Sequence, residues 1–148
     1  MIPLDKSSLF HQFVTFTANV HQVTHELTQN VTVANITPLQ YKILEYIKVS
    51  QPVTPTEISE CQHMSLPNTS RELRKLQDQN LIEKWNDTED RRKQYIRLSI
   101  EGEKMMEAAF ACIEERFLQL IQHATQEDIK DIQHALSILE QKVFQQKD

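Results

Sequence analysis

The sequence contains a single glycine, Gly102, among its 148 residues. Nucleotide-binding loops of the Rossmann and P-loop types need several closely spaced glycines, because side chains would keep the backbone away from the phosphates. The scarcity of glycine therefore excludes nucleotide-dependent enzymes of both types.

Cysteine is also scarce. The two cysteines, Cys61 and Cys112, lie far apart in the chain, so they form neither a secreted disulfide framework nor a CxxC site. Cys61 follows Glu60 and lacks the positively charged neighbours that activate a thiolate. Cys112 lies among alanines and an isoleucine, which predicts a small buried thiol.

Long apolar runs are absent as well. The longest ones are far shorter than a membrane span, and no basic segment followed by an apolar one opens the chain. We therefore expect a soluble, cytoplasmic protein. With 39% apolar and 25% charged residues, the composition is that of a globular protein, and the length suits one domain over residues 1–148.

No catalytic or metal-binding constellation stands out. The many acidic residues fall on helix faces as partners of Lys and Arg four residues away, and no nucleophile is paired with a base. His21 and His25 have a spacing that can bind a metal, but no third ligand lies near them. We therefore expect no enzyme activity, no cofactor and no metal.

Positive charge is in deficit overall, but it is concentrated in one region. The net charge is -5, yet between Arg71 and Arg97 the basic residues outnumber the acidic ones. The densest part of this region is the segment DTEDRRKQYIRLS. A local basic surface on an acidic body suits a small DNA-binding module, because only the docking face meets phosphates.

The first part of the chain predicts two helices. Apolar residues at three- and four-residue spacing form one stripe over residues 8–31. The members of this stripe are Phe13, Phe16, Val20, Val23 and Leu27. Thr37 as N-cap and Pro38 at the first helical position begin a second helix, which ends before Pro52.

A helix-turn-helix follows. Thr54, with Glu57 three residues later, predicts a capping box at the start of a short helix. Ser65 then begins a helix rich in Arg, Lys, Asn and Ser, and Asn80 takes the left-handed position that usually ends a helix with glycine. The short connection between the two helices is typical of a helix-turn-helix.

The remainder predicts a hairpin and two long helices. Alternating residues in IEKW and QYIRLS indicate a β-hairpin with its tip over 86–93. Ser99 caps a helix running to about residue 122, and Thr125 with Asp128 begins the last helix. The expected fold is mainly α: a winged helix-turn-helix, about 36–99, between long dimerisation helices, about 8–31 and 100–146.

One face of the helix after Ser65 is available for DNA. On a helical wheel, Leu66, Thr69, Leu73 and Leu76 cluster on the side that faces the core. The opposite side has short polar residues that allow close approach to base edges, and an arginine that can bind guanine bidentately. The predicted DNA-binding residues of this helix are Pro67, Asn68, Ser70, Arg71, Arg74 and Lys75.

A pattern of five residues carries a family resemblance. Asp90, Arg92, Leu98, Ser99 and Gly102 form the pattern D-x-R-x5-L-[ST]-x-x-G. In this pattern the sequence resembles the MarR family of winged helix-turn-helix transcriptional regulators. The segments ITPLQYKILEYI and LRKLQDQNLI resemble the family's second helix and the end of its recognition helix, so the resemblance covers the full length. Asn80 replaces the glycine that usually closes that helix.

The resemblance implies a mode of DNA binding. Asp90 would brace Arg92 at the wing tip, and Arg92 would enter the minor groove, where a narrow A·T tract concentrates negative potential. Arg91 and Lys93 would face phosphates. The resemblance also implies a homodimer, in which the first, fifth and sixth helices interlock, on a palindromic double-stranded DNA operator.

The dimer has its own sequence signal. Apolar residues of the last helix alternate at three- and four-residue steps, which is typical of a coiled-coil seam. The first helix offers a matching stripe. The predicted dimerisation residues are Phe13, Val20, Leu27, Ile129, Ile132, Leu136, Leu139 and Val143.

We therefore expect a sequence-specific DNA-binding transcriptional regulator, a dimeric repressor released by a small ligand or another signal. Phe13, Phe16 and Tyr41 form a candidate ligand pocket between the first, second and fifth helices, although the same residues would also suit a packed core. The alternative is a protein-interaction module that uses the winged helix only as a scaffold. The basic helix face and the intact D-x-R tip favour DNA binding.

Overall fold

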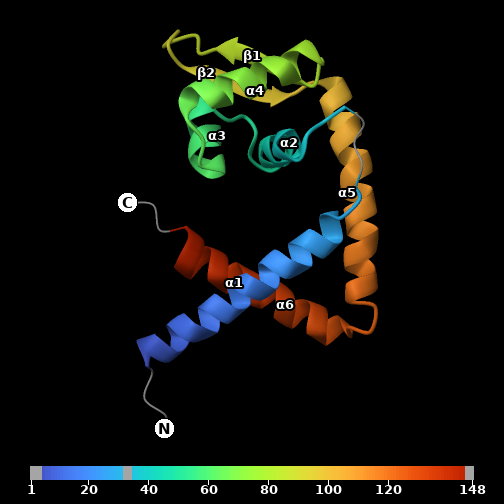
Figure 1. The fold of residues 1–148 in the computed structure, drawn as a ribbon. Coiled ribbons are helices and arrows are strands. Elements are labelled where there is room, and N and C mark those ends of the chain that lie inside the picture. Colours follow the sequence, from blue (N-terminus) through green and yellow to red (C-terminus); the bar gives the residue numbers. More distant parts are fainter. Residues whose placement is uncertain (1–4, 32–34, 146–148) are drawn as a thin grey trace. The chain divides into compact units, whose positions relative to one another are not determined.

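The structure is a computed structural model that describes residues 5–31 and 35–145 (Figure 1). Its elements in chain order are α1 (Lys6–Thr28), α2 (Pro38–Ser50), α3 (Pro55–Gln62), α4 (Leu66–Asp78), β1 (Ile82–Asn86), β2 (Gln94–Leu98), α5 (Ile100–Leu120), α6 (Gln126–Leu139) and a π-helical turn (Glu140–Phe144). The chain divides into two compact units, whose boundary falls inside α5 between Ile113 and Glu114. The predicted mainly α winged helix-turn-helix is confirmed.

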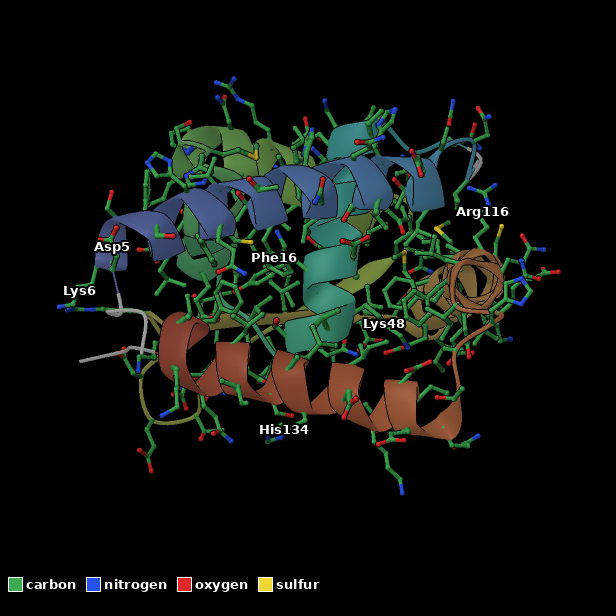
Figure 2. The ribbon with its side chains drawn as sticks, turned by 90° about the horizontal axis from the view of Figure 1, so that it is seen from below. Asp5, Lys6, Phe16, Lys48, Arg116 and His134 are labelled. Atoms are coloured by element: carbon green, nitrogen blue, oxygen red, sulfur yellow. The ribbon has the colours of Figure 1, made fainter. Side chains whose placement is uncertain are left out.

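α1 begins earlier than the apolar stripe indicates. Asp5 accepts a hydrogen bond at Oδ1 from the Ser7 backbone N–H, 3.0 Å away, and so caps a helix that begins at Lys6, two residues before the predicted start at residue 8. Figure 2 shows Asp5 and Lys6 at the beginning of α1 and Phe16 farther along it. The predicted end of the last helix, near residue 146, lies outside the described residues.

Reciprocal caps begin two other helices. Thr37 Oγ1 accepts from the Gln40 N–H, and Gln40 Oε1 accepts from the Thr37 N–H, both at 3.1 Å. Thr125 and Asp128 make the same pair of bonds at the start of α6. Both caps satisfy backbone donors that a helix start leaves without partners. The predicted caps at Thr37 and Thr125 are confirmed.

The cap of α3 is simpler than predicted. Thr54 Oγ1 accepts from the Glu57 N–H at 3.2 Å, but the Glu57 carboxylate does not return the bond to the Thr54 backbone in this described segment. The predicted capping box is therefore only half formed. Glu57 is exposed, so water can solvate its carboxylate instead.

The core lies inside the winged helix. Apolar residues from α2, α3, α4, the hairpin and the first half of α5 pack together. They are Ile43, Leu44, Ile47, Val53, Ile58, Leu73, Leu76, Leu81, Ile82, Ile96, Leu98 and Met106. Burying each such side chain contributes about 1.5–3 kcal/mol. Leu66, predicted on the buried side of α4, is exposed instead, because the core contacts of that helix begin one turn later at Thr69.

The hairpin is anchored to the connection between α2 and α3. β1 and β2 pair antiparallel, with Ile82 opposite Leu98 and Trp85 opposite Tyr95. Val53 then pairs with the outer edge of β2: its N–H donates to the Ile96 carbonyl at 3.0 Å and its carbonyl accepts from the Ile96 N–H at 2.7 Å. These two bonds fix the wing to the helix-turn-helix.

A polar network joins α2, β2 and α5. Lys48 Nζ lies 2.6 Å from Glu103 Oε2, and Gln51 Nε2 donates to Glu103 Oε1 at 2.7 Å (Figure 2 labels Lys48). The Gln51 side-chain oxygen accepts from the Leu98 N–H at 2.9 Å. The hydrogen bond from Lys48 holds the pKa of Glu103 below its usual range, and the hydrogen bond to Glu103 raises the pKa of Lys48. The charged pair thereby links the winged helix to the start of α5.

The single glycine lies where two segments of backbone nearly touch. A Cβ at Gly102 would lie 2.1 Å from the Leu81 carbonyl oxygen. Ser99 Oγ accepts from the Gly102 N–H at 2.9 Å and donates to the Asn80 carbonyl at 2.6 Å. Asn80 has φ 64, so the predicted left-handed position is confirmed. The L-[ST]-x-x-G part of the sequence pattern therefore joins the end of α4 to the start of α5.

The core ends partway along α5. Ala109 is the last buried residue of that helix, and α6 has none among its described residues. Cys112, which the sequence predicts to be buried, is exposed because α5 has left the core at this point; Cys61 is exposed too. Within the described ranges, no helix is both long and apolar enough to cross a membrane.

Candidate nucleic-acid interface

The two faces of α4 are sharply different. Thr69, Leu73 and Leu76 are buried, and Thr69 also donates its hydroxyl to the Ser65 carbonyl at 2.9 Å. The sequence-predicted DNA-binding residues are all exposed on this helix: Pro67, Asn68, Ser70, Arg71, Arg74 and Lys75. The helix therefore presents a polar and basic surface, while its apolar side holds it on the core.

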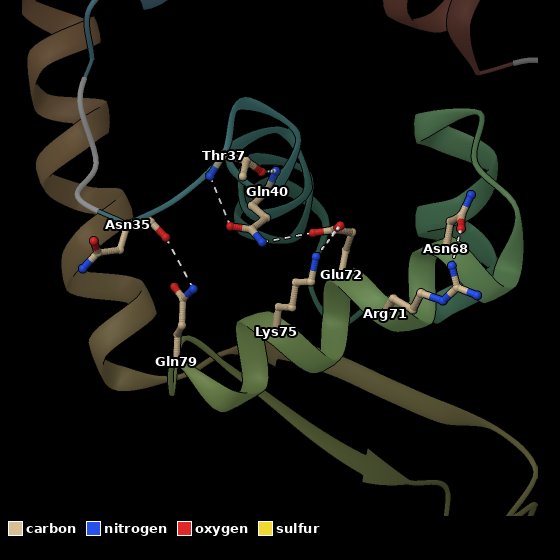
Figure 3. Close-up of polar contacts among 8 residues, drawn as sticks. All are labelled: Asn35, Thr37, Gln40, Asn68, Arg71, Glu72, Lys75 and Gln79. Atoms are coloured by element: carbon tan, nitrogen blue, oxygen red, sulfur yellow. Dashed lines mark hydrogen bonds and ion pairs between the residues drawn. The ribbon is translucent and has the colours of Figure 1, made fainter.

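Arg71 is oriented by its own helix. Its Nη1 donates to Asn68 Oδ1 at 3.4 Å, one turn toward the N-terminus (Figure 3). Ser65 Oγ caps the helix by accepting from the Asn68 N–H at 3.2 Å. The guanidinium is thus held over the N-terminal half of α4, which is the part of a recognition helix that meets base edges.

Lys75 contacts an acidic residue that the sequence interpretation overlooked. Its Nζ lies 3.4 Å from Glu72 Oε1, and the second oxygen of Glu72 accepts from Gln40 Nε2 at 3.0 Å (Figure 3). The Glu72 side chain is 17% exposed and that of Lys75 is 61% exposed. An acidic residue flanked by Arg71, Arg74 and Lys75 is the sequence signal that could have identified Glu72.

Lys84 adds a further positive charge beside α4. Burial lowers its pKa and the nearby charge of Arg74 lowers it further, while Asp78 opposes the shift. The strand alternation assigns Lys84 to one face of the hairpin, but nothing in the sequence places it near Arg74. The proximity of Lys84 to Arg74 extends the basic surface of α4 onto β1.

The wing tip is closed by main-chain bonds around Asp90. The Asp87 N–H donates to the Lys93 carbonyl at 2.9 Å, and the Lys93 N–H donates to the Asp90 carbonyl at 3.0 Å. Asp90 Oδ1 accepts from the Arg92 backbone N–H at 3.0 Å. Asp90, Arg91, Arg92 and Lys93 are all exposed. The tip therefore displays three cations from an ordered turn.

Asp90 and Arg92 are joined through the backbone and not through the guanidinium. No ion pair links their side chains in the part of the chain that the structure describes. Asp90 therefore shapes the turn that carries Arg92 and leaves the guanidinium exposed.

Arg97 is tied to the face of the hairpin. Its Nε donates to Glu83 Oε2 at 2.9 Å, and its guanidinium carbon lies 5.0 Å from the centre of the Trp85 ring. The Trp85 and Tyr95 rings lie 5.8 Å apart. Cross-strand pairs of this kind stabilise a two-stranded ribbon. The basic cluster around the wing thus divides into a structural residue, Arg97, and the tip cations.

A cavity of about 530 Å³ lies between the end of α1 and the start of α2. It is lined by Thr24, His25, Thr28, Asn30, Val31, Ile36, Thr37, Pro38, Tyr41, Lys42 and Glu45. Of the candidate pocket residues, Tyr41 lines it and Phe13 and Phe16 do not; their rings lie 6.2 Å apart on α1. The Tyr41 hydroxyl oxygen is buried near the Glu45 carboxylate and makes no well-formed hydrogen bond among the described residues. Burial, with the charge of Glu45, raises the pKa of Tyr41.

The predicted dimerisation residues differ in exposure. Val20 of α1 is exposed, as are Ile132, Leu136 and Val143 near the C-terminus. The others are half-buried: Phe13, Leu27, Ile129 and Leu139. Leu136 is the most exposed of the set, at 57%. Each of the two units therefore leaves apolar side chains open to water.

Comparison with known proteins shows what part of the chain and which fold are shared. Residues 34–93 match the sequence model of the MarR family, and no curated protein matches the chain. A MarR family protein from Bacillus stearothermophilus is 20% identical with a TM-score of 0.70, over 94% of this chain and 95% of that one. MarR of Staphylococcus aureus, solved with salicylate and kanamycin, is 20% identical with a TM-score of 0.69, over 95% of each chain.

A third solved structure contains nucleic acid. The F27L mutant of Staphylococcus aureus MepR, bound to an oligodeoxyribonucleotide, is 22% identical with a TM-score of 0.58, over 89% of this chain and 97% of that one. At these identities the likeness shows a shared fold. Residues 34–93, which include α2, α3, α4 and β1, are thus the part of the chain that is similar to the MarR family.

Proposed function

We propose that the protein is a sequence-specific regulator that binds a palindromic double-stranded DNA operator as a homodimer. One observation carries the proposal: the exposed basic face of α4 and the ordered cations of the wing tip belong to the same unit. A helix of this kind fits the major groove, and a pre-oriented arginine suits the minor groove beside it.

In this proposal α4 reads the bases in the major groove, and the wing contacts the minor groove and the DNA backbone. Arg71 would bind guanine, while Arg74 and Lys75 would contact phosphates. At the tip, Arg92 would enter the minor groove, with Arg91 and Lys93 on the backbone. The MepR structure with an oligodeoxyribonucleotide supports this arrangement, because it has the same fold.

Two copies of the chain would form the regulator. The apolar residues exposed on α1 and α6 would be buried between protomers, each contributing roughly 1.5–3 kcal/mol. Dimerisation would also place two recognition helices on half-sites roughly 10 bp apart. A symmetric dimer requires a palindrome, since both protomers read the same sequence.

A small molecule in the cavity beside Tyr41 would release the DNA. The buried hydroxyl of Tyr41 lies near the Glu45 carboxylate without a well-formed hydrogen bond, so a polar ligand could bind it. The MarR structure with salicylate supports small-molecule binding to this fold. We therefore propose a cytoplasmic repressor with a ligand-controlled affinity for its operator.

The experiment is selection of bound sequences from random duplex DNA by the full-length protein. We expect one palindromic sequence to be enriched. Lys93→Ala should weaken retention on mixed-sequence DNA at low salt, whereas Lys104→Ala removes the same charge from an exposed position on α5 and should not. Absence of retention by the wild-type protein at low salt would contradict DNA binding and favour a protein-interaction module.

A further inference from the structure

A continuous chain of hydrogen bonds runs from the start of α2 to the exposed face of α4 (Figure 3). The Thr37 N–H donates to Gln40 Oε1 at 3.1 Å. Gln40 Nε2 donates to Glu72 Oε2 at 3.0 Å, and Lys75 Nζ lies 3.4 Å from Glu72 Oε1. These bonds therefore connect the start of α2 with α4, although the two helices are distant in sequence.

One end of this chain borders the cavity. Thr37, Pro38 and Tyr41, all at the start of α2, line it. A second bond crosses between the same two regions: Gln79 Nε2 donates to the Asn35 carbonyl at 3.4 Å (Figure 3). Thr37 in the cavity wall is thus linked to the recognition helix through Gln40, and Asn35, next to the wall residue Ile36, is bonded to Gln79 just after that helix.

The Glu72 carboxylate is divided between two partners. Gln40 is only 4% exposed, and its amide uses its oxygen on Thr37 and its nitrogen on Glu72. Lys75 is the one cation that forms an ion pair with Glu72 among the described residues. If Gln40 moves away, the full charge of the carboxylate is left to Lys75, and a lysine held by a carboxylate is less available to a phosphate.

We propose that Glu72 is a positioning residue that couples the cavity wall to DNA affinity by controlling the availability of Lys75. While Gln40 holds one carboxylate oxygen, Lys75 is held weakly and can contact phosphate. When the start of α2 is disturbed, Glu72 captures Lys75 and the DNA contact is lost. The proposal rests on the proposed function, because it requires α4 to face DNA.

The test measures how DNA affinity depends on salt, using the full-length protein and a mixed-sequence duplex. Each phosphate contact contributes about 0.9 to the slope of log affinity against log salt concentration. Gln40→Leu removes the amide, so Glu72 should capture Lys75, and the slope should become shallower by about 1 per protomer. Glu72→Gln removes the charge, so Lys75 should be free and the slope should be kept.

The decisive measurement is the double variant. In the Glu72→Gln background, Gln40→Leu should leave the slope unchanged, because no carboxylate remains to capture Lys75. Gln79→Ala is the matched control: it removes the other bond between these regions and should leave the slope unchanged in both backgrounds. An equal loss of slope from Gln40→Leu in both backgrounds, or no loss in the wild-type background, would overturn the coupling.

A second variant covers the case in which Gln40→Leu fails to fold. Thr37→Ala loosens the cap at an exposed residue and keeps the Gln40 amide. It should make the slope shallower in the wild-type background but not with Glu72→Gln, and an unchanged slope would count against the coupling. A wild-type protein without DNA affinity at low salt would instead disprove the proposed function.

Discussion

At the scale of single residues, small groups decide the shape of the segments that we propose to face DNA. Asp90 is an acidic residue among cations that we propose to contact phosphates. Its repulsion from the phosphates would by itself weaken DNA binding. Its carboxylate accepts from the Arg92 N–H at 3.0 Å, and this bond holds the turn that displays Arg92. Asp90 therefore stabilises the turn through its acceptor oxygen, and its negative charge is not needed for this bond.

This argument separates two substitutions of Asp90. Asp90→Ala should weaken DNA binding, although it removes a negative charge from the interface. Asp90→Asn keeps an acceptor oxygen and should bind at least as tightly as the wild type. Fluorescence anisotropy with a labelled operator measures both, with Arg92→Ala as the reference for loss of the tip. Tighter binding by Asp90→Ala would show that the tip is only a charge cluster.

Gly102 is a second residue whose size matters more than its chemistry. In a helix, alanine is favoured over glycine by about 1 kcal/mol. At this position, however, a Cβ would lie 2.1 Å from the Leu81 carbonyl oxygen, so the backbone would have to move. We expect Gly102→Ala to lower the free energy of unfolding by roughly 1–3 kcal/mol despite its helix propensity.

Urea unfolding of the full-length protein measures this change. Ala108→Ser is the control, because it also adds one heavy atom to α5 but at an exposed position. It should change the free energy of unfolding by no more than about 0.5 kcal/mol. Equal stability of Gly102→Ala and the wild type would contradict the prediction that a Cβ at position 102 clashes with the Leu81 carbonyl.

At the scale of elements, α4 would combine two tasks along its length in the proposed function. Its N-terminal half carries Arg71, which Asn68 orients, and its C-terminal half carries Lys75, which Glu72 restrains. A bidentate arginine distinguishes bases, whereas a lysine on phosphate does not. The two halves should therefore respond differently to mutation.

Arg71→Ala should cost about 1–3 kcal/mol of binding free energy on the operator and relax discrimination at one base position. Lys75→Ala should weaken binding to all sequences alike. Titration against the operator and its single-base variants separates the two effects, with Lys104→Ala as the charge control. An unchanged base preference in Arg71→Ala would assign base readout to another residue.

At the scale of the whole molecule, the terminal helices expose apolar residues that a second copy of the chain would cover. Leu136 is 57% exposed, and no residue of α6 is buried within the described chain. In a monomer, replacing such a residue would change stability by less than about 0.5 kcal/mol. In a dimer it would place a charge in the interface, at a much larger cost.

Leu136→Asp should therefore lower the melting temperature, make it depend on protein concentration, and abolish operator binding, although Leu136 is not among the proposed DNA contacts. Analytical ultracentrifugation beside a DNA titration measures both effects. His134→Asp is the control, because two residues along a helix lie on nearly opposite sides. A folded Leu136→Asp monomer that still binds the full operator tightly would show that the dimer interface lies elsewhere.

The sequence alone determined the features that depend on neighbouring residues. The caps at Thr37 and Thr125 and the left-handed Asn80 follow from groups within a few positions of one another, and the hairpin follows from two alternating segments joined by a short connection. Hydrogen bonds of this range are set by residue type and spacing, because the geometry of one helical turn or one strand pair hardly varies. The exposed face of α4 is predictable as well, because the regular helical period decides which residues share one side.

Only the tertiary structure decided which elements meet and at what distance. The bond from Gln40 to Glu72, the approach of Leu81 to Gly102 and the cavity beside Tyr41 each join segments far apart in the chain. Periodicity shows that a side chain points inward, but it does not set how helices rotate and cross. That is why Leu66 was assigned to the core and Glu72 was overlooked. The physical reason is that such contacts are selected by packing, which involves the whole core at once.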